Sequence, residues 1–130
     1  MSAQGRTDPI IVGFTEVDAL VRGPDAHQRV LLLVDSGARF TVLPDEVWRR
    51  IGLTPGRTMT FQLADGTHIE RAMSECYIEL GEHRGHTPVV LGAPSDVALL
   101  GVITLEQFGL ILNPFSRTLQ PARMLLALAA

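Results

Sequence analysis

The chain has 130 residues, of which 46% are hydrophobic and 19% are charged, with a formal net charge of −3. This length fits one domain with a substantial core and excludes two separately packed lobes. The 11 Lys and Arg residues are scattered, so the sequence carries no basic patch suited to nucleic acid. No run approaches the roughly 20 apolar residues of a membrane helix, and the single cysteine, Cys76, excludes an internal disulfide.

The chain begins with polar residues, and positions 1–8 lack the apolar run of a signal peptide. A lone cysteine also fits a reducing compartment. We therefore expect a cytoplasmic protein that binds neither nucleic acid nor a membrane.

The first predicted element is a β-hairpin. Its arms are Phe14 to Val21 and Arg29 to Val34, with the turn signal Arg-Gly-Pro-Asp at 22–25 between them. A short apolar run, Ile10 to Val12, precedes the first arm. The second arm is apolar on both faces, which predicts a central strand.

Asp35 follows that arm directly, and Ser36 and Gly37 then turn the backbone. A carboxylate at the end of an apolar strand is costly if it is desolvated without partners. Two interpretations remain open at this point: Asp35 bonds the backbone two residues on in an Asx-type turn, or it takes part in chemistry.

A short helix is predicted next, and a long hairpin follows it. The helix opens at Pro44, runs through Arg50 and ends at Gly52. The side chains that it offers to the core are Val47, Trp48 and Ile51. The hairpin has the arms Thr58 to Leu63 and Thr67 to Leu80, with a two-residue Asp-Gly connection at 65–66.

The remaining chain is predicted to be strands around one helical turn. A strand from His86 to Leu91 leads into a loop at 92–95, and an apolar strand at 97–100 leads to Gly101. The helical turn covers about Thr104 to Phe108, with Gly109 ending it. Strands at 110–112 and 118–119 flank a turn at 113–116.

Three of these segments, taken in order, resemble one protease family. They are Leu-Leu-Leu-Val-Asp-Ser-Gly-Ala at 31–38, Phe-Gln-Leu-Ala-Asp-Gly-Thr at 61–67 and Leu-Leu-Gly-Val-Ile-Thr-Leu-Glu-Gln-Phe-Gly-Leu at 99–110. Their order and separation are similar to those of the retropepsins, the single-domain aspartic proteases typified by the retroviral enzymes, and of their bacterial and cellular relatives. The similarity runs from about Val12 to Pro121.

The resemblance implies a mainly β, single-lobe acid protease fold with one or two short helices, completed as a homodimer. Residues 1–9 are then a flexible N-terminus, residues 10–121 the retropepsin-like domain and residues 122–130 an apolar C-terminal tail. Peptide hydrolysis without a metal or a nucleophilic side chain needs two adjacent carboxyl groups, and this chain supplies one Asp-Ser-Gly. Two chains must therefore meet on a two-fold axis, with terminal strands such as Leu110 to Asn113 at the interface.

The same resemblance implies an aspartic endopeptidase that acts on peptide or protein substrates, with Asp35 as the catalytic acid and base. Residues implied to support the motif are Ser36, Gly37, Ala38 and Thr41. Residues implied to contact substrate are Arg39, Val97 and Leu99 and, at the tip of a flap hairpin, Ala64, Asp65, Gly66 and Thr67. The alternative is a module that dimerises or binds peptides with little turnover. No cofactor is expected.

Two positions depart from the retroviral pattern. The retroviral enzymes have an acidic residue where this chain has Arg39, and an arginine where it has Val102. Those two residues form a structural ion pair near the dimer contact in the retroviral enzymes, and losing both avoids an unpaired buried charge. The departure leaves the strength of the dimer and the contacts to the substrate backbone open.

Other candidate sites are weaker. His83 and His86 stand close in sequence, but a turn gives them no reason to converge with a third metal ligand, so no metal is expected. Cys76 and Trp48 are expected to pack in the core rather than react. The apolar run at 124–130 is either a helix against the dimer or a flexible tail.

Overall fold

The computed structural model describes residues 16–113 and 115–122. The main sheet has seven strands: β1 (Glu16–Arg22), β2 (His27–Val34), β3 (Thr41–Leu43), β4 (Thr58–Gln62), β5 (His68–Leu80), β6 (His83–Leu91) and β7 (Leu99–Leu100). A separate two-stranded sheet holds β8 (Leu110–Asn113) and β9 (Thr118–Pro121), and the helices are α1 (Asp45–Ile51) and α2 (Val102–Gln107). The expected mainly β chain with two short helices is confirmed. The expected terminal segments at 1–9 and 123–130, and the run Ile10 to Val12, lie outside the described residues.

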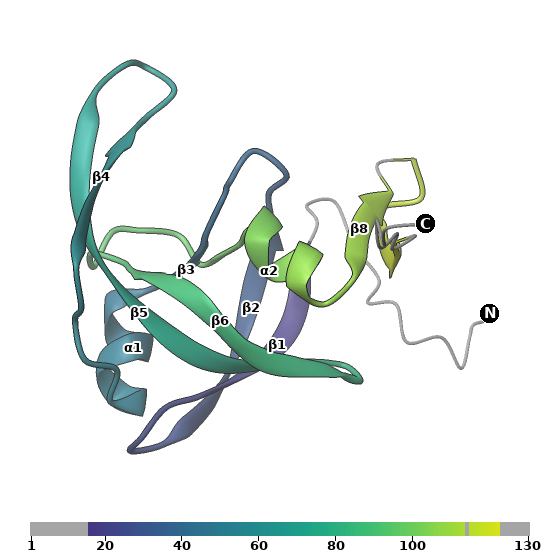
Figure 1. The fold of residues 1–130 in the computed structure, drawn as a ribbon, viewed down its shortest axis with the longest axis horizontal. Coiled ribbons are helices and arrows are strands. Elements are labelled where there is room, and N and C mark those ends of the chain that lie inside the picture. Colours follow the sequence, from purple (N-terminus) through teal and green to yellow (C-terminus); the bar gives the residue numbers. More distant parts are fainter. Residues whose placement is uncertain (1–15, 114, 123–130) are drawn as a thin grey trace, which may run out of the picture.

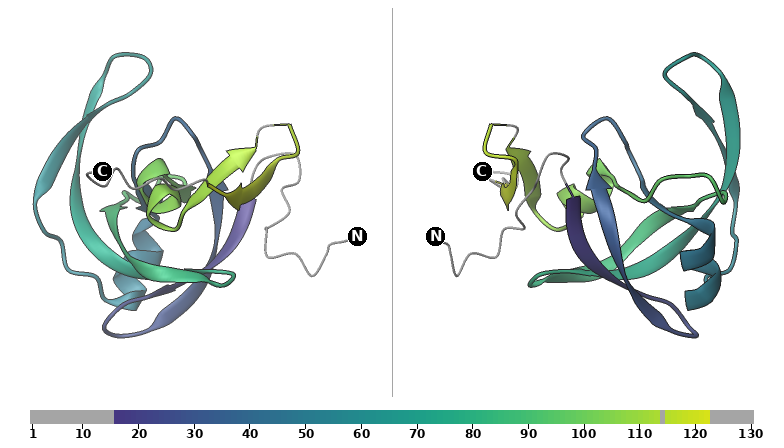
Figure 2. Two further views of the ribbon diagram at one scale, coloured as in Figure 1. Left: turned by 45° about the vertical axis from the view of Figure 1, so that its right-hand side comes forward. Right: turned by 180° about the vertical axis from the view of Figure 1, so that it is seen from behind.

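The main sheet curls on itself. Its strand order is β1-β2-β7-β3-β6-β5-β4, and β1 pairs with β5 as well, so the sheet closes between β1 and β5 and leaves β4 outside the closure (Figure 1). The pairings β2–β7 and β3–β6 are parallel, while β1–β2, β5–β6 and β4–β5 are antiparallel. The short β8–β9 hairpin stands beside this sheet, and the β4–β5 hairpin extends away from it (Figure 2).

The core lies on the inner face of the curled sheet. In the β1–β2 hairpin the alternate residues Val17, Ala19 and Val21 are buried, and so are Val30, Leu32 and Val34. The hairpin itself is confirmed, with Arg22 opposite His27 at its turn. The expected central position of β2 is confirmed, because β2 pairs with β1 on one side and β7 on the other. Its second apolar face is not buried, however, since Leu31 is 61% exposed. The sheet has a single layer here, so only one face of the strand meets the core.

Helix α1 follows the expectation closely. Asp45 and Glu46 occupy its first turn, where they complement the positive end of the helix dipole. Its apolar side chains Val47, Trp48 and Ile51 are buried. Gly52 ends it with a left-handed backbone (φ 86°), which glycine adopts without strain.

The β4–β5 hairpin differs from the expectation at its tip. The register pairs Gln62 with His68, and the backbone N–H of Leu63 donates to Thr67 O, which leaves a three-residue connection at 64–66 rather than two residues. Gly66 has a φ of 90°, as in a three-residue loop whose last residue is left-handed. An Asp-Gly pair serves both kinds of turn, so the sequence alone does not select between them.

Two boundaries near the second motif also differ. Strand β7 contains only Leu99 and Leu100, because the preceding residues form a loop, and α2 begins at Val102 rather than near Thr104. The early start is explained by tertiary hydrogen bonds, since the backbone N–H groups of Val102 and Ile103 at the start of the helix donate to Ala38 O and Arg39 O. Gly109 has a φ of 70° after the helix, as its expected role in ending the helix requires.

Candidate active site

Asp35 stands at the end of β2, in a turn held by its own side chain. The backbone N–H of Gly37 donates to Asp35 Oδ1 (2.8 Å), and the N–H of Ala38 donates to Asp35 O (3.0 Å). The Asx-type turn is therefore present. The carboxylate is exposed in the single chain, so the desolvation cost expected from the sequence does not arise there. Its second oxygen remains available for other partners, and neighbouring Ser36 is exposed as well.

The segment after Asp35 is framed by backbone contacts to the second motif. Asp35 N donates to Leu100 O (3.3 Å), and the bonds from Val102 and Ile103 reach Ala38 O and Arg39 O at 2.8 and 3.0 Å. Arg39 itself is exposed. These main-chain bonds join the two motifs at the point where the retroviral pattern would place an ion pair, so the frame does not depend on the side chains at 39 and 102.

Three fully buried threonines lie beneath this frame. Thr41 Oγ1 is 2.7 Å from Thr104 Oγ1, which is 2.8 Å from Thr87 Oγ1, and the backbone N–H of Gly101 donates to Thr41 Oγ1 (3.1 Å). Thr41 thus bonds the backbone of the second motif, and its support of the Asp35 motif stays a prediction. Thr87 and Thr104 were missed. Thr87 stands outside the three motifs, Thr104 lies within the second motif but was assigned no role there, and their sequence gives no sign that their hydroxyls meet.

Gly101 is required at its position by close packing. A Cβ there would lie 2.3 Å from the carbonyl carbon of Phe40, far inside van der Waals contact. The glycine of the second motif thus lets β7 pass directly under the residues that follow Asp35.

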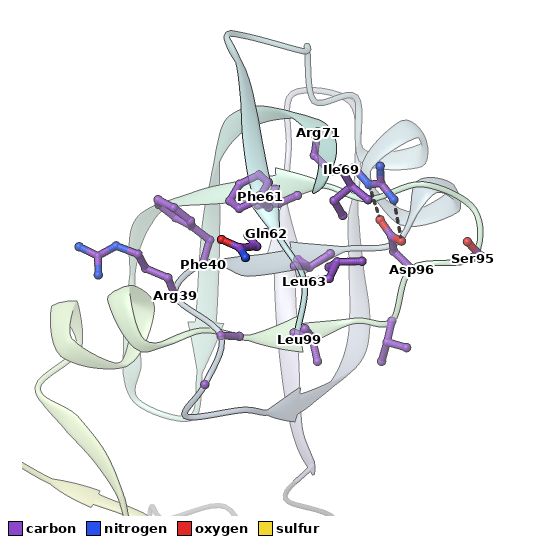
Figure 3. A pocket seen from close by; sticks show the side chains of 15 residues that line it. Arg39, Phe40, Phe61, Gln62, Leu63, Ile69, Arg71, Ser95, Asp96 and Leu99 are labelled. Carbon is purple, nitrogen blue, oxygen red and sulfur yellow. Dashed lines mark hydrogen bonds and ion pairs between the residues drawn. The ribbon is translucent and has the colours of Figure 1, made fainter. Parts of the chain in front are cut away.

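A cavity of about 520 Å³ opens beside the Asp35 turn. Five of the predicted site residues line this one cavity, with Arg39 and Leu99 labelled in Figure 3. They are Gly37, Ala38, Arg39, Val97 and Leu99. The opposite wall comes from the β4–β5 hairpin. The apolar side chains that this hairpin contributes are Phe61, Leu63 and Ile69.

These three hairpin residues were missed, and the predicted tip residues do not line the cavity. Ala64, Asp65, Gly66 and Thr67 are all exposed at the end of the hairpin. Asp65 Oδ1 accepts bonds from the hydroxyl (2.7 Å) and the backbone N–H (3.0 Å) of Thr67, which lower the pKa of the Asp65 carboxyl. The alternation of apolar residues at 61, 63 and 69 was the available signal, because residues two apart in a strand share one face.

One ion pair belongs to the same cavity. Arg71 on β5 donates to both oxygens of Asp96, with Nε–Oδ2 at 2.6 Å and Nη2–Oδ1 at 3.0 Å. The hydrogen bond from Arg71 lowers the pKa of the Asp96 carboxyl, so that carboxyl stays ionised in mildly acidic solution. No sequence pattern indicates that these two residues, 25 positions apart, form a pair.

The remaining candidates pack rather than bind. His83 stacks on Phe108 and His86 lies edge-on against Tyr77, with ring centroids 6.3 and 5.1 Å apart. Within residues 16–113 and 115–122, no three His, Cys, Asp or Glu residues gather as metal ligands, and no helix is long and apolar enough to cross a membrane. Cys76 is buried, and burial raises the pKa of its thiol to about 11, which suppresses the reactive thiolate.

Comparisons with known proteins agree with this geometry. The family model described as "Aspartyl protease" matches residues 17–104, which include Asp35 and the first part of the second motif, Leu99 to Thr104. No sequence among the curated proteins matches the chain.

Two solved structures are similar in fold. The EIAV protease complexed with the inhibitor HBY-793 is 19% identical, with a TM-score of 0.57 over 85% of this chain and 91% of that one. The solution structure of the Simian Foamy Virus (mac) protease is 20% identical, with a TM-score of 0.49 over 66% of this chain and 86% of that one. The family match and the fold lead to one conclusion: the chain belongs to the aspartyl protease family and has a retropepsin-like, single-lobe fold.

Proposed function

We propose that the protein is an aspartic endopeptidase that works as a homodimer, with the Asp35 carboxyl groups of two chains forming one catalytic dyad. The observation that carries the proposal is the exposed Asp35 carboxylate, fixed by Gly37 N–H and set beside a cavity of about 520 Å³. A single chain presents this group once, and the chemistry needs it twice.

In the dyad the two carboxyl groups share one proton, because two close like charges do not both ionise. The ionised group takes a proton from a water molecule as the water attacks the scissile carbonyl carbon. The protonated group donates to the carbonyl oxygen, and a proton then passes to the leaving amine when the carbon–nitrogen bond breaks. The hydrogen bond from Gly37 N–H fixes the orientation of each Asp35 carboxylate during these steps.

The lining of the cavity supports a peptide substrate. Apolar side chains from the β4–β5 hairpin face apolar side chains at Val97 and Leu99, and this cavity is the right place for a substrate's apolar side chain. An extended peptide between the hairpin and the Asp35 turn would present alternate side chains to it. The expected cytoplasmic location is part of this proposal, and an intracellular site calls for a selective rather than a digestive enzyme.

The β8–β9 hairpin supports assembly from two chains. It is an isolated two-stranded sheet, which is marginally stable by itself. Ile111 on this hairpin is 51% exposed. A second copy of the chain would extend the sheet and cover this side chain, as an isologous interface does.

The second candidate is a dimerising or peptide-binding module with little turnover. It is favoured by the departure at Arg39 and Val102, which removes the ion pair of the retroviral pattern from the neighbourhood of the acid. The first candidate requires Asp35 for peptide cleavage. The second requires only the cavity, for peptide binding.

The deciding experiment compares the full chain with its Asp35→Asn variant on a randomised decapeptide library at pH 4 to 7. The variant should fold normally, since Asp35 is exposed and an asparagine oxygen still accepts the Gly37 N–H. Cleavage should fall on the order of a thousandfold or more, because the general acid and base are lost together.

Asp18→Asn, an exposed carboxylate in β1, serves as the matched control and should cleave like the wild type. Undiminished cleavage by Asp35→Asn contradicts the proposal. Binding of library peptides by both proteins with no cleavage by either supports the module instead.

A further inference from the structure

The ion pair between Arg71 and Asp96 is shielded from solvent compared with other surface pairs in the described chain. The two side chains are 21% and 22% exposed, whereas those of Arg29 and Asp18 are 70% and 56% exposed. Its two parallel hydrogen bonds fix the planar guanidinium against the carboxylate. A pair of this geometry holds its two segments in one relative position, which an exposed pair does not.

Arg71 lies at the root of a two-stranded arm. Strand β5 pairs with β6 only from Ala72 onward, and residues before it pair with β4 alone. Residues 58–71 therefore leave the sheet as an arm, visible in Figure 1 as the hairpin that extends beyond β6. A two-stranded ribbon is weakly constrained by its own pairing, so a contact at its root decides the direction in which it points.

Asp96 organises the loop at 92–98 on the other side. Its Oδ2 accepts from Ala93 N–H (2.8 Å), and its own N–H donates to Ala93 O (2.9 Å). The start of the loop is fixed separately, because Trp48 Nε1 donates to Gly92 O (2.9 Å) and Gly92 N donates to Leu43 O (2.8 Å). Val97, the next residue after Asp96, is 60% exposed at the edge of the cavity.

The ion pair thus joins two walls of the cavity that are far apart in sequence. One wall is the arm, with Phe61, Leu63 and Ile69, and the other is loop 92–98 with Val97. Figure 3 shows Arg71 and Asp96 meeting on the side of the cavity opposite Arg39. The distance between the walls decides how well an apolar side chain fills the space between them.

We propose that Arg71 and Asp96 are positioning residues that hold the arm against loop 92–98 and so set the affinity of the site for an apolar side chain of an extended peptide. This inference rests on the proposed peptide-cleaving function, and it assigns substrate affinity to a pair that does not contact the acid. Losing the pair lets the arm move away from Val97 and leaves the Asp35 turn unchanged.

The kinetic test compares Arg71→Met, Arg71→Lys and the wild type on a single peptide, the best-cleaved member of a randomised decapeptide library. Arg71→Met keeps the bonds of Asp96 within its loop. It removes the link between the loop and the arm, together with the bond from Arg71 Nη1 to Glu70 O within the arm. KM should rise about three- to tenfold while kcat changes less than about twofold, as expected for the loss of a half-buried charge-assisted contact that is not made to the reacting atoms. The KM of Arg71→Lys should lie between those of the wild type and Arg71→Met, since an ammonium group keeps the charge but cannot form the two parallel hydrogen bonds.

The matched control is Arg29→Met, which breaks the exposed pair between β1 and β2 and should leave both constants unchanged. Unchanged KM in Arg71→Met overturns the inference. A fall in kcat with KM unchanged also overturns it, because the pair would then act on the chemical step.

Amide hydrogen exchange gives a readout that does not require cleavage. In Arg71→Met the amides of residues 58–71 should exchange faster than in the wild type, while those of β1 and β2 should not change. If the wild type proves inactive, this comparison still decides the inference, and equal exchange in the arm overturns it. Faster exchange in the arm of Arg71→Met, together with no peptide cleavage by the wild type, would contradict the proposed function but still support the positioning role of the pair.

Discussion

Arg39 is a charged residue at the rim of a largely apolar cavity. Figure 3 shows its guanidinium extending outward from the rim, on the opposite side from Arg71 and Asp96. Position 102 holds Val rather than the arginine of the retroviral pattern, so that cation does not compete with Arg39 for an anionic partner. Arginine offers planar donors suited to carboxylates, so substrate carboxylates that pass the rim are its natural partners.

At the residue scale, Arg39 is therefore expected to select for charge. The wild type should prefer acidic residues a few positions from the scissile bond, and the preference should weaken as salt is added. Arg39→Asp should reverse that preference at little cost in stability, because the bonds of the frame use its backbone oxygen. Sequencing the products of library cleavage measures both profiles, with Arg50→Asp on α1 as the control. Coincident profiles for wild type and Arg39→Asp would show that Arg39 is only a solvated side chain.

Single residues were predictable where a motif fixed them. Asp35, Gly37 and Leu99 were placed by short patterns, because a strand, a turn and a second strand have strong local signals. Thr87, Thr104 and Asp96 have no local signal, since their partners are chosen by the packing of distant segments. Their contributions became visible only when the three-dimensional neighbours were known.

At the scale of elements, the buried threonines connect three parts of the fold. Thr41 lies on β3, Thr87 on β6 and Thr104 on α2, and the hydroxyl of Thr104 stands between the other two. The same group reaches the second motif through the bond from Gly101 N–H to Thr41. Buried hydroxyl groups are costly to leave unpaired, so the central member should matter most.

Thr104→Val keeps the shape of the side chain and removes this central hydroxyl. The free energy of unfolding should fall by about 1–3 kcal/mol, because the hydroxyls of Thr41 and Thr87 each lose a partner. Denaturant unfolding followed by the fluorescence of Trp48, the single tryptophan, measures the change. Thr54→Val, an exposed threonine after α1, should change stability by less than about 0.5 kcal/mol. A Thr104→Val protein as stable as the wild type would show that the three hydroxyls contribute nothing net.

Elements were predicted better than their ends and their exposed faces. Helix α1 followed from its opening proline, acidic first turn and closing glycine, all of which act locally. The two-residue connection predicted for the β4–β5 hairpin was wrong, and the exposed second face of β2 did not follow from its apolar sequence. The two cases share a reason. Each depends on which partner the strand meets, and an apolar or Asp-Gly pattern is compatible with more than one partner.

At the scale of the molecule, the closed sheet was accessible only through the resemblance to retropepsins. The pairing of β1 with β5 and the parallel pairing of β3 with β6 join segments about 40 to 60 residues apart. Strand pairing over such distances leaves no periodic signal in one sequence. The order of the three motifs predicted the closed sheet instead, since the motifs indicated a family whose fold is known.

The last expectation concerns the two-chain assembly, and it depends on the β8–β9 hairpin. Ile111 projects 51% of its surface to solvent from a two-stranded sheet that pairs with no strand of the main sheet in the described chain. Fully burying an isoleucine contributes about 1.5–3 kcal/mol, so covering the exposed half of Ile111 on both chains contributes about that much in total. Ile111→Asp should therefore weaken the dimer on the order of a hundredfold, since each 1.4 kcal/mol is a factor of ten.

Sedimentation over a range of concentrations measures this dissociation constant, and specific activity should fall on dilution through the same range. Leu31→Asp is the matched control, because Leu31 is equally apolar and 61% exposed but lies on β2, away from this hairpin. It should leave the dimer unchanged. If Ile111→Asp dimerises like the wild type, the interface lies elsewhere; if specific activity stays flat while every molecule sediments as a monomer, the shared dyad itself is wrong. The Ile111→Asp variant therefore tests where the interface lies, and the dilution of the wild type tests whether activity needs a dimer at all. Only the requirement for a dimer follows from the chemistry of a single Asp35 in each chain.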